Sequence, residues 1–85
     1  MMTNKIIVKL YVPILEKKYD VFLPINKKIY NIVKLLVKAL NEFSGESFNP
    51  ELLPVLYDKI TAEPYDYNLT VKESNIKNGT EIILI

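Results

Sequence analysis

The sequence predicts an α+β fold in which one main helix lies across a mixed sheet of about four to five strands. A single apolar stripe with helical spacing runs from Ile29 to Phe43, and strand-like segments stand before and after it. One such stripe needs one sheet face to cover it. Because 85 residues suit a single core, we expect one domain that spans residues 1–85.

Two alternating segments predict a hairpin at the start of the chain. From Lys5 to Val12, one face carries apolar residues and the other is mixed: Ile6, Val8, Leu10 and Val12 against Lys5, Ile7, Lys9 and Tyr11. Pro13 ends this strand because proline lacks an N–H group. A connection through Lys18 leads to a second strand at residues 19–25, where Pro24 indicates an edge strand or a strand end.

The clearest periodicity predicts a helix from Lys27 to about Phe43, with Asn26 as its N-cap. The residues expected to face the sheet recur at helical spacing: Ile29, Ile32, Val33, Leu36, Val37, Leu40 and Phe43. Polar residues occupy the opposite face: Lys27, Asn31, Lys34, Lys38 and Asn41. Gly45 suits the position after the last helical residue, because glycine readily adopts a positive φ.

The second half of the chain predicts a polar loop at residues 46–52 and shorter strands after it. A third strand is expected at residues 53–58 and a brief fourth strand at residues 60–62. Thr70 and Glu73 have the spacing of a capping box, which predicts a short helical turn. After the Asn78-Gly79 turn, residues 80–85 form the last strand, which is apolar enough to lie at the centre of the sheet.

Composition argues against several classes of function. The chain has no Cys and no His, so we expect no enzyme activity, no catalytic residues, no metal site and no cofactor. All 11 basic residues are Lys, against 10 acidic residues, and without Arg we expect no nucleic-acid partner. No apolar run is long enough to span a bilayer, and no charged-then-apolar signal segment opens the chain, so we expect a cytoplasmic protein without membrane insertion.

Two segments carry a family resemblance. Leu69-Thr70-Val71, then Ser74-Asn75-Ile76, a turn and a terminal aliphatic strand resemble the closing segment of ubiquitin and its relatives. Tyr19-Asp20-Val21-Phe22-Leu23-Pro24, followed by the apolar helix and by Ile76 to Ile85, resembles the small bacterial ubiquitin-fold proteins of the YukD/EsaB group. The resemblance implies a ubiquitin-like β-grasp, whose first and last strands pair in parallel, in a bacterial, cytosolic accessory of type VII secretion.

An apolar patch on the exposed sheet face is the predicted protein-binding site. Ubiquitin-like domains commonly bind partners through such a face, and here the candidates are Ile7, Tyr11, Leu56, Ile83 and Ile85. The alternative is that some of these residues belong to the core, since sequence does not determine the register of the sheet.

Two further features have both a functional and a structural interpretation. The lysine stripe of the helix, Lys27, Lys34 and Lys38, could attract an acidic partner, although such a stripe is more often a solvated face. Tyr57, Tyr65 and Tyr67 could form an aromatic contact surface, or at least one of them could pack beneath the loop.

The sequence therefore predicts a non-catalytic ubiquitin-like protein–protein interaction module, with a component of a type VII secretion system as its partner. The chain shows no terminal Gly-Gly after its last strand, so we do not expect it to be conjugated. Two alternatives remain open: a ubiquitin-like modifier or sulfur carrier, and a self-associating scaffold that forms a homodimer.

Overall fold

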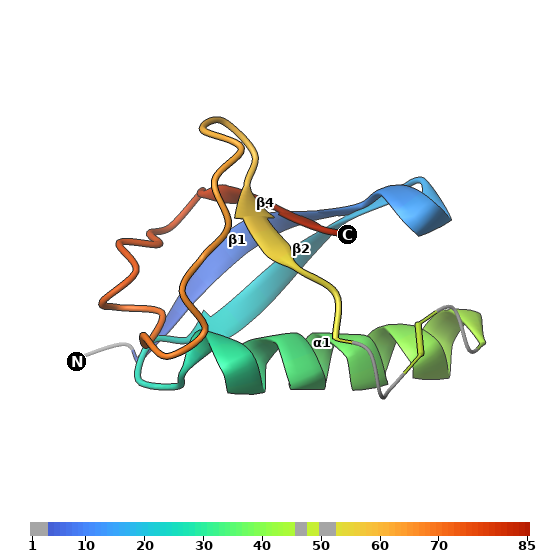
Figure 1. The fold of residues 1–85 in the computed structure, drawn as a ribbon, viewed down its shortest axis with the longest axis horizontal. Helices are drawn as coiled ribbons and strands as arrows, with labels where there is room; N and C mark the ends of the chain where they lie inside the picture. The colour runs from blue at the N-terminus through green and yellow to red at the C-terminus, as the bar shows by residue number, and fades with distance from the viewer. Residues whose placement is uncertain (1–3, 46–47, 50–52) are drawn as a thin grey trace.

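The computed structural model describes residues 4–45, 48–49 and 53–85. Within them, strands β1 (Lys5–Val12), β2 (Lys17–Pro24), β3 (Leu56–Asp58) and β4 (Glu81–Leu84) form one sheet in the order β2-β1-β4-β3. Helix α1 (Ile29–Ser44) lies across one face of this sheet, and the 3₁₀-helix η1 (Pro13–Leu15) joins β1 to β2 (Figure 1). The predicted α+β fold, with a mixed sheet and one main helix, is confirmed.

The centre of the sheet is made by the first and last strands. β1 pairs antiparallel with β2 over its full length and parallel with β4, where Lys9, Leu10 and Tyr11 lie opposite Glu81, Ile82 and Ile83. β3 pairs antiparallel with the other side of β4. The predicted central position of the last strand and its parallel pairing are therefore confirmed.

The core lies between the sheet and α1. Val8, Leu10 and Val12 of β1 and Ile82 and Leu84 of β4 have at most 1% of their surface exposed. The helix contributes six of its seven predicted stripe residues to the same core: Ile29, Ile32, Val33, Leu36, Val37 and Leu40. The inward-facing strand residues therefore pack against the apolar stripe of the helix, as predicted.

Phe43 is the exception to the predicted stripe. Its side chain is 81% exposed, and Phe48 is buried in the core instead. Asn41 holds Phe48 in place, because its side-chain amide donates to the Phe48 carbonyl at 3.0 Å and accepts from the Phe48 N–H at 3.0 Å. The prediction that Asn41 lies on the solvent face is also wrong, because these bonds turn it toward the chain that follows the helix.

The helix begins later than predicted. Its N-cap residue is Lys28 rather than Asn26, and no side chain caps it. Backbone carbonyls from a distant segment take that role: the N–H of Ile29 donates to Leu69 at 2.8 Å and the N–H of Tyr30 to Tyr67 at 3.2 Å. The first N–H groups of a helix lack partners within the helix, so this long-range contact satisfies two of them.

The turns before β4 follow their predicted chemistry. The Thr70 N–H donates to the Glu73 carboxylate at 2.9 Å, and the Glu73 N–H donates to the Thr70 hydroxyl at 3.1 Å, which is the reciprocal pair of a capping box. These bonds hold the pKa of Glu73 below its ordinary value. Gly79 has a φ of +84°, and its N–H donates to the Ile7 carbonyl at 2.8 Å, so the turn joins β1 directly.

The predicted fourth strand at residues 60–62 is a turn. The Asp58 carboxylate accepts the N–H groups of Ile60 at 2.8 Å and Thr61 at 3.0 Å, and Ala62 adopts a φ of +60°. The third strand is also shorter than predicted and begins at Leu56. The predicted loop at residues 46–52 lies mostly outside the described part of the chain. Figure 1 shows the segment after this turn running from the tip of β3 down to the start of α1 and back to β4.

Two tyrosines cover the free edge of β3. The Tyr67 hydroxyl donates to the Pro54 carbonyl and accepts the Leu56 N–H, while the Tyr65 N–H donates to the Leu56 carbonyl at 3.0 Å. The Tyr65 hydroxyl also donates to Asp58 at 3.1 Å. Burial and the Asp58 charge raise the pKa of Tyr65, so its hydroxyl keeps its proton at neutral pH. The loop thereby supplies the partners that an edge strand otherwise lacks.

Ile82→Ala should destabilise the protein strongly, because Ile82 has no exposed surface and pairs with Leu10 at the centre of the sheet. We expect the free energy of unfolding to fall by about 2–5 kcal/mol in urea denaturation. The control is Ile60→Ala, since Ile60 is 84% exposed; it should change this free energy by less than about 0.5 kcal/mol. Equal losses in the two variants would contradict the assignment of the core.

Asp58→Asn should destabilise the protein at neutral pH and have little effect in acid. The N–H of Thr61, followed by other donors, holds the pKa of Asp58 below its ordinary value of 3.8. The stabilisation is therefore complete above that ordinary value and is lost as the pH falls through the lower folded-state pKa. Urea denaturation from pH 7 to strongly acidic pH should show the two proteins converging below pH 3.8; a constant difference would contradict this role for the charge.

Candidate interaction surface

The outer face of the sheet, opposite α1, is organised in rows that cross the strands. Since alternate residues of a strand share a face, pairing between strands places their side chains side by side. One row is charged: Asp20 of β2 lies opposite Lys9, Lys9 lies opposite Glu81 of β4, and Lys59 follows β3 beside Glu81. The charges alternate in sign along this row.

Two ion pairs connect the charged row. The Lys9 Nζ lies 3.6 Å from the Asp20 carboxylate, and the Lys59 Nζ lies 3.5 Å from the Glu81 carboxylate. The first pair is about two-thirds exposed, and exposed pairs of this kind contribute roughly 0–1 kcal/mol. The charged row therefore contributes little to stability. Its main effect is to separate the apolar side chains on its two sides.

An aromatic–aliphatic row lies beside the charged one. Tyr11 of β1 is opposite Ile83 of β4, and Ile83 is opposite Tyr57 of β3. Lys18 stands at the β2 end of this row, with its Nζ 5.9 Å from the centre of the Tyr11 ring. Because tyrosine is enriched in protein interfaces and these side chains are partly exposed together, this row is the best candidate for a contact surface.

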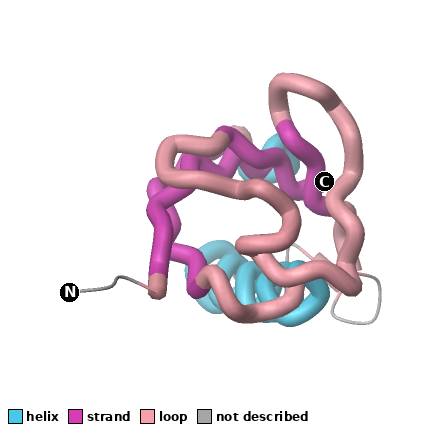
Figure 2. Tube along the Cα trace, turned by 90° about the vertical axis from the view of Figure 1, so that its left-hand side faces the viewer, coloured by secondary structure: helices cyan, strands magenta, loops and turns pink. Residues whose placement is uncertain are grey.

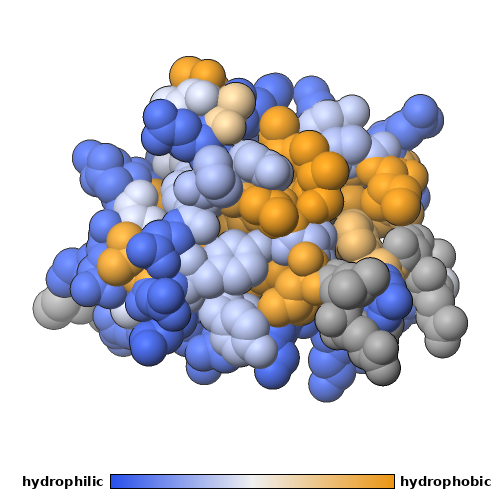
Figure 3. Space-filling model, in the orientation of Figure 1, coloured by the Kyte–Doolittle hydropathy of each residue, from blue (hydrophilic) through white to orange (hydrophobic). Residues whose placement is uncertain are grey.

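The row continues toward the C-terminal end of β4. Val55 and Ile85 form a pair through two backbone hydrogen bonds of 2.7 and 3.0 Å, and their side chains follow Tyr57 and Ile83 by strand alternation. Ile85 is 63% exposed and Val55 is 36% exposed. Figure 3 shows apolar side chains gathered over β3 and the C-terminal end. We call Tyr11, Val55, Tyr57, Ile83 and Ile85 the sheet-face cluster.

The structure brings together three of the five residues predicted as a protein-binding patch. Tyr11, Ile83 and Ile85 belong to the sheet-face cluster, whereas Ile7 lies across the charged row beside Phe22. Leu56 was expected on the exposed face, and this is wrong: it has no exposed surface, because it lies opposite Leu84 and shares its inward face.

On β3, Tyr57 and not Leu56 is the residue whose side chain lies on the outer face of the sheet. Its position could be found from sequence only if the register of β3 against β4 were known, because one residue of slip exchanges the two faces. The predicted aromatic surface of three tyrosines is divided as well. Tyr65 and Tyr67 pack against the core and close the β3 edge, so Tyr57 alone lies on the sheet face.

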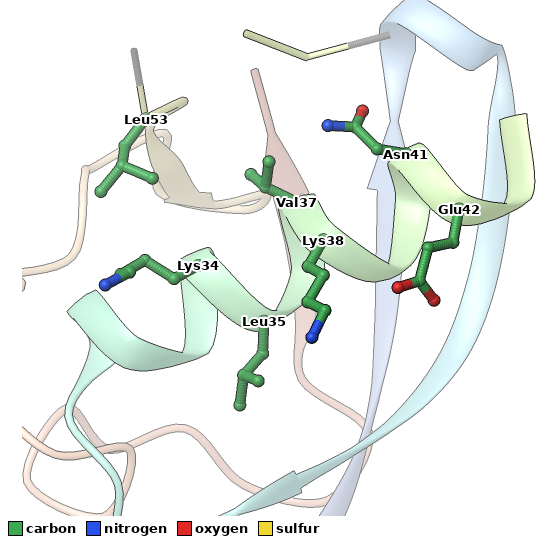
Figure 4. Close-up of a pocket in the computed structure, with 7 residues that line it drawn as sticks. All are labelled: Lys34, Leu35, Val37, Lys38, Asn41, Glu42 and Leu53. Atoms are coloured by element: carbon green, nitrogen blue, oxygen red, sulfur yellow. The ribbon is translucent and has the colours of Figure 1, made fainter. Parts of the chain in front are cut away.

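The predicted lysine stripe, Lys34 and Lys38 of α1 with Lys27 in the turn before it, is solvated. Lys27, Lys34 and Lys38 are exposed, and the Lys34 Nζ lies 5.2 Å from the centre of the Tyr30 ring. A hollow of about 590 Å³ lies along this part of α1, next to Leu53. Figure 4 shows that its side chains do not converge: Val37 and Asn41 point to one side of the helix and Leu35 and Lys38 to the other. The hollow therefore has no centre at which polar groups could hold a ligand.

Other kinds of site find no support in the described residues. Residues 4–45, 48–49 and 53–85 contain no group of three or more acidic side chains close enough together to hold a metal ion. No helix in this part of the chain has both the length and the apolar character needed to cross a bilayer.

No protein-family model matches the chain, and no curated protein matches it in sequence. Solved structures do match its fold. The ubiquitin-like domain of the type VII secretion system protein EccD1 from Mycobacterium tuberculosis aligns with a TM-score of 0.72 and 12% identity, over 98% of this chain and 99% of that domain.

Two further structures broaden the comparison. A chain of the MycP5-free ESX-5 inner membrane complex aligns with a TM-score of 0.77 and 15% identity, over 98% of this chain but 21% of that one. The N-terminal ubiquitin-like domain of the 4931431F19Rik protein aligns with a TM-score of 0.74 and 17% identity, over 99% of this chain and 76% of that one. At these identities the matches show the fold alone, and that fold, a four-stranded mixed sheet with one main helix, is ubiquitin-like.

Proposed function

We propose that this chain is a non-catalytic protein-interaction module that acts as a cytoplasmic accessory of a bacterial type VII secretion system, of the YukD/EsaB kind. Its contact surface is the sheet-face cluster. The observation that carries the proposal is the row of Tyr11, Ile83 and Tyr57, which lie side by side and partly exposed on the face of the sheet opposite α1.

The chemistry of this surface supports a protein partner. Tyrosine combines a large apolar area with a hydroxyl group and loses little conformational freedom on binding, so it is frequent in protein interfaces. The aliphatic side chain of Ile83 lies opposite both rings, Ile85 follows it two residues later beside Val55, and the charged row borders Ile83 on the other side. An apolar centre with a charged border is the usual anatomy of a protein contact.

The likeness to type VII proteins supports the cellular setting. One similar domain belongs to the secretion protein EccD1, and another lies within a chain of an inner membrane complex. A ubiquitin-like domain in such an assembly is a natural precedent for a module that works by contact. The partner proposed here is accordingly a membrane component of the secretion apparatus.

The test is affinity recovery from cells of the native host with tagged wild-type protein and two variants, Ile83→Lys and Ile85→Lys. We expect the wild type to recover a type VII secretion component, identified by mass spectrometry, and each variant to recover at least tenfold less, because a lysine would place an unpaired charge in the contact. Leu56→Lys is unsuitable, since it would bury a charge in the core.

The matched control is Leu35→Lys, which adds the same charge to a side chain that is 52% exposed on α1. Circular dichroism should show all three variants folded. Recovery that is unchanged in both sheet-face variants but lost in Leu35→Lys would move the contact to the helix. Recovery of ubiquitin-type activating enzymes in place of secretion components would overturn the proposal.

A further inference from the structure

The two edge strands of the sheet differ: the chain covers the outer edge of β3 but leaves the outer edge of β2 uncovered in the described residues. At the β3 edge, every outward backbone group of Leu56 and Asp58 has a partner in the loop that follows: Tyr67, Tyr65, Glu63 and Ala62. At the β2 edge no comparable cover is present among residues 4–45, 48–49 and 53–85. An uncovered strand of eight residues is a template on which another strand can pair.

The hydrogen bonds between β1 and β2 identify which groups are free. The N–H of Ile25 donates to Asn4 at 2.9 Å, so odd-numbered residues of β2 bond to β1. The N–H of Lys9 donates to Thr80 on the other side of β1, which agrees with this alternation. The N–H and C=O groups of Lys18, Asp20 and Phe22 therefore point outward from the sheet.

An apolar groove runs beside the same edge, between β2 and α1. It has a volume of about 280 Å³, and Tyr19, Val21, Leu36 and Phe43 are among the residues that line it. Two of the lining residues are exposed: Phe43 of α1 by 81% and Phe22 of β2 by 67%. A strand that paired with β2 would cover this groove as well as satisfy the free backbone groups, which is the arrangement of β-strand addition.

We propose that the occupant of the β2 edge is β2 of a second copy of this chain, in an antiparallel pair about a two-fold axis. Lys18 of one copy lies opposite Asp20 of the other, and Tyr19 lies opposite its own counterpart. The pairing extends the sheet across both copies and goes beyond the proposed function, because it uses a different surface from the sheet-face cluster.

The charges of β2 select both the partner and the register. The two strands can form hydrogen bonds only if residues whose backbone groups point away from β1 lie opposite each other. This requirement leaves few registers for the pair. One register would place Asp20 opposite the second Asp20, and the next would place Asp20 opposite Phe22. Only the register that pairs Lys18 with Asp20 matches opposite charges, and symmetry makes that match twice.

The charges of Lys18 and Asp20 also disfavour pairing of β2 with a partner strand that has only apolar side chains. Lysine on an edge strand normally prevents pairing, because its charge would lose water without gaining a partner. A strand that offers a carboxylate opposite Lys18 and an ammonium group opposite Asp20 removes this penalty, and β2 itself is such a strand. Asp20 already contacts Lys9, but that pair is about two-thirds exposed and leaves the carboxylate open to a second cation.

The experiment is sedimentation of the full chain from micromolar to millimolar concentration, with three variants. Lys18→Asp and Asp20→Lys each place like charges opposite each other twice, so each should weaken self-association by about tenfold or more. The double variant Lys18→Asp/Asp20→Lys exchanges the two charges and should restore the dimer. Lys38→Asp, an exposed change on α1, is the matched control and should leave association unchanged.

Amide hydrogen exchange gives a second readout that does not depend on side-chain charge. The amides of Lys18 and Asp20 should become slower to exchange as the concentration of wild-type protein rises, while that of Ile60 in the loop after β3 should not. A wild type that stays monomeric at millimolar concentration, or a dimer that the single charge changes leave intact, would overturn the proposal. Ile83→Lys should still dimerise, so failure of the sheet-face proposal would be seen separately.

Discussion

The parallel pairing of β1 with β4 is the contact on which the rest of the structure depends. It joins Lys9–Tyr11 to Glu81–Ile83, near opposite ends of the chain, and it brings Leu10 and Ile82 together beneath α1. With these strands at the centre, β2 and β3 become the outer strands. The pairing therefore decides which face is covered by the helix, which face is exposed and which edges need protection. Closing so long a loop has an entropic cost, and burial of the two strands against the helix offsets it.

The segment before β4 couples the helix to this centre. Leu69 and Tyr67 accept the first N–H groups of α1, Val71 is fully buried, and Val71 and Lys72 donate to Lys27 and Ile25 in the turn before the helix. Figure 2 shows this loop passing close to the helix before it reaches the strands. Because the segment leads directly into β4, the start of the helix and the position of the central strand are set by the same contacts. This explains why α1 needs no side-chain cap at Lys28.

The surfaces left by this arrangement differ in character. The outer face carries a charged row and an aromatic–aliphatic row, one edge is closed by two tyrosines, and the other edge is open beside an apolar groove. The two proposed contacts use different surfaces, one a face and one an edge. At such surfaces, charges select partners more than they strengthen binding. Exposed ion pairs contribute little energy, but like charges exclude the wrong partner.

The sequence by itself determined the α+β class, the inward face of β1, six of the seven stripe residues of α1, the capping box at Thr70 and the terminal strand, because these follow from local periodicity and turn chemistry. The tertiary structure decided what local pattern cannot express. The register of β3 against β4 buried Leu56 and exposed Tyr57 to the outer face, distant carbonyls moved the start of the helix from Lys27 to Ile29, and Asn41 brought Phe48 into the core in place of Phe43. Each of these outcomes depends on a partner that lies far away in the chain or beyond the end of the helix. The sequence of a short apolar segment does not determine which of its faces such a partner will cover.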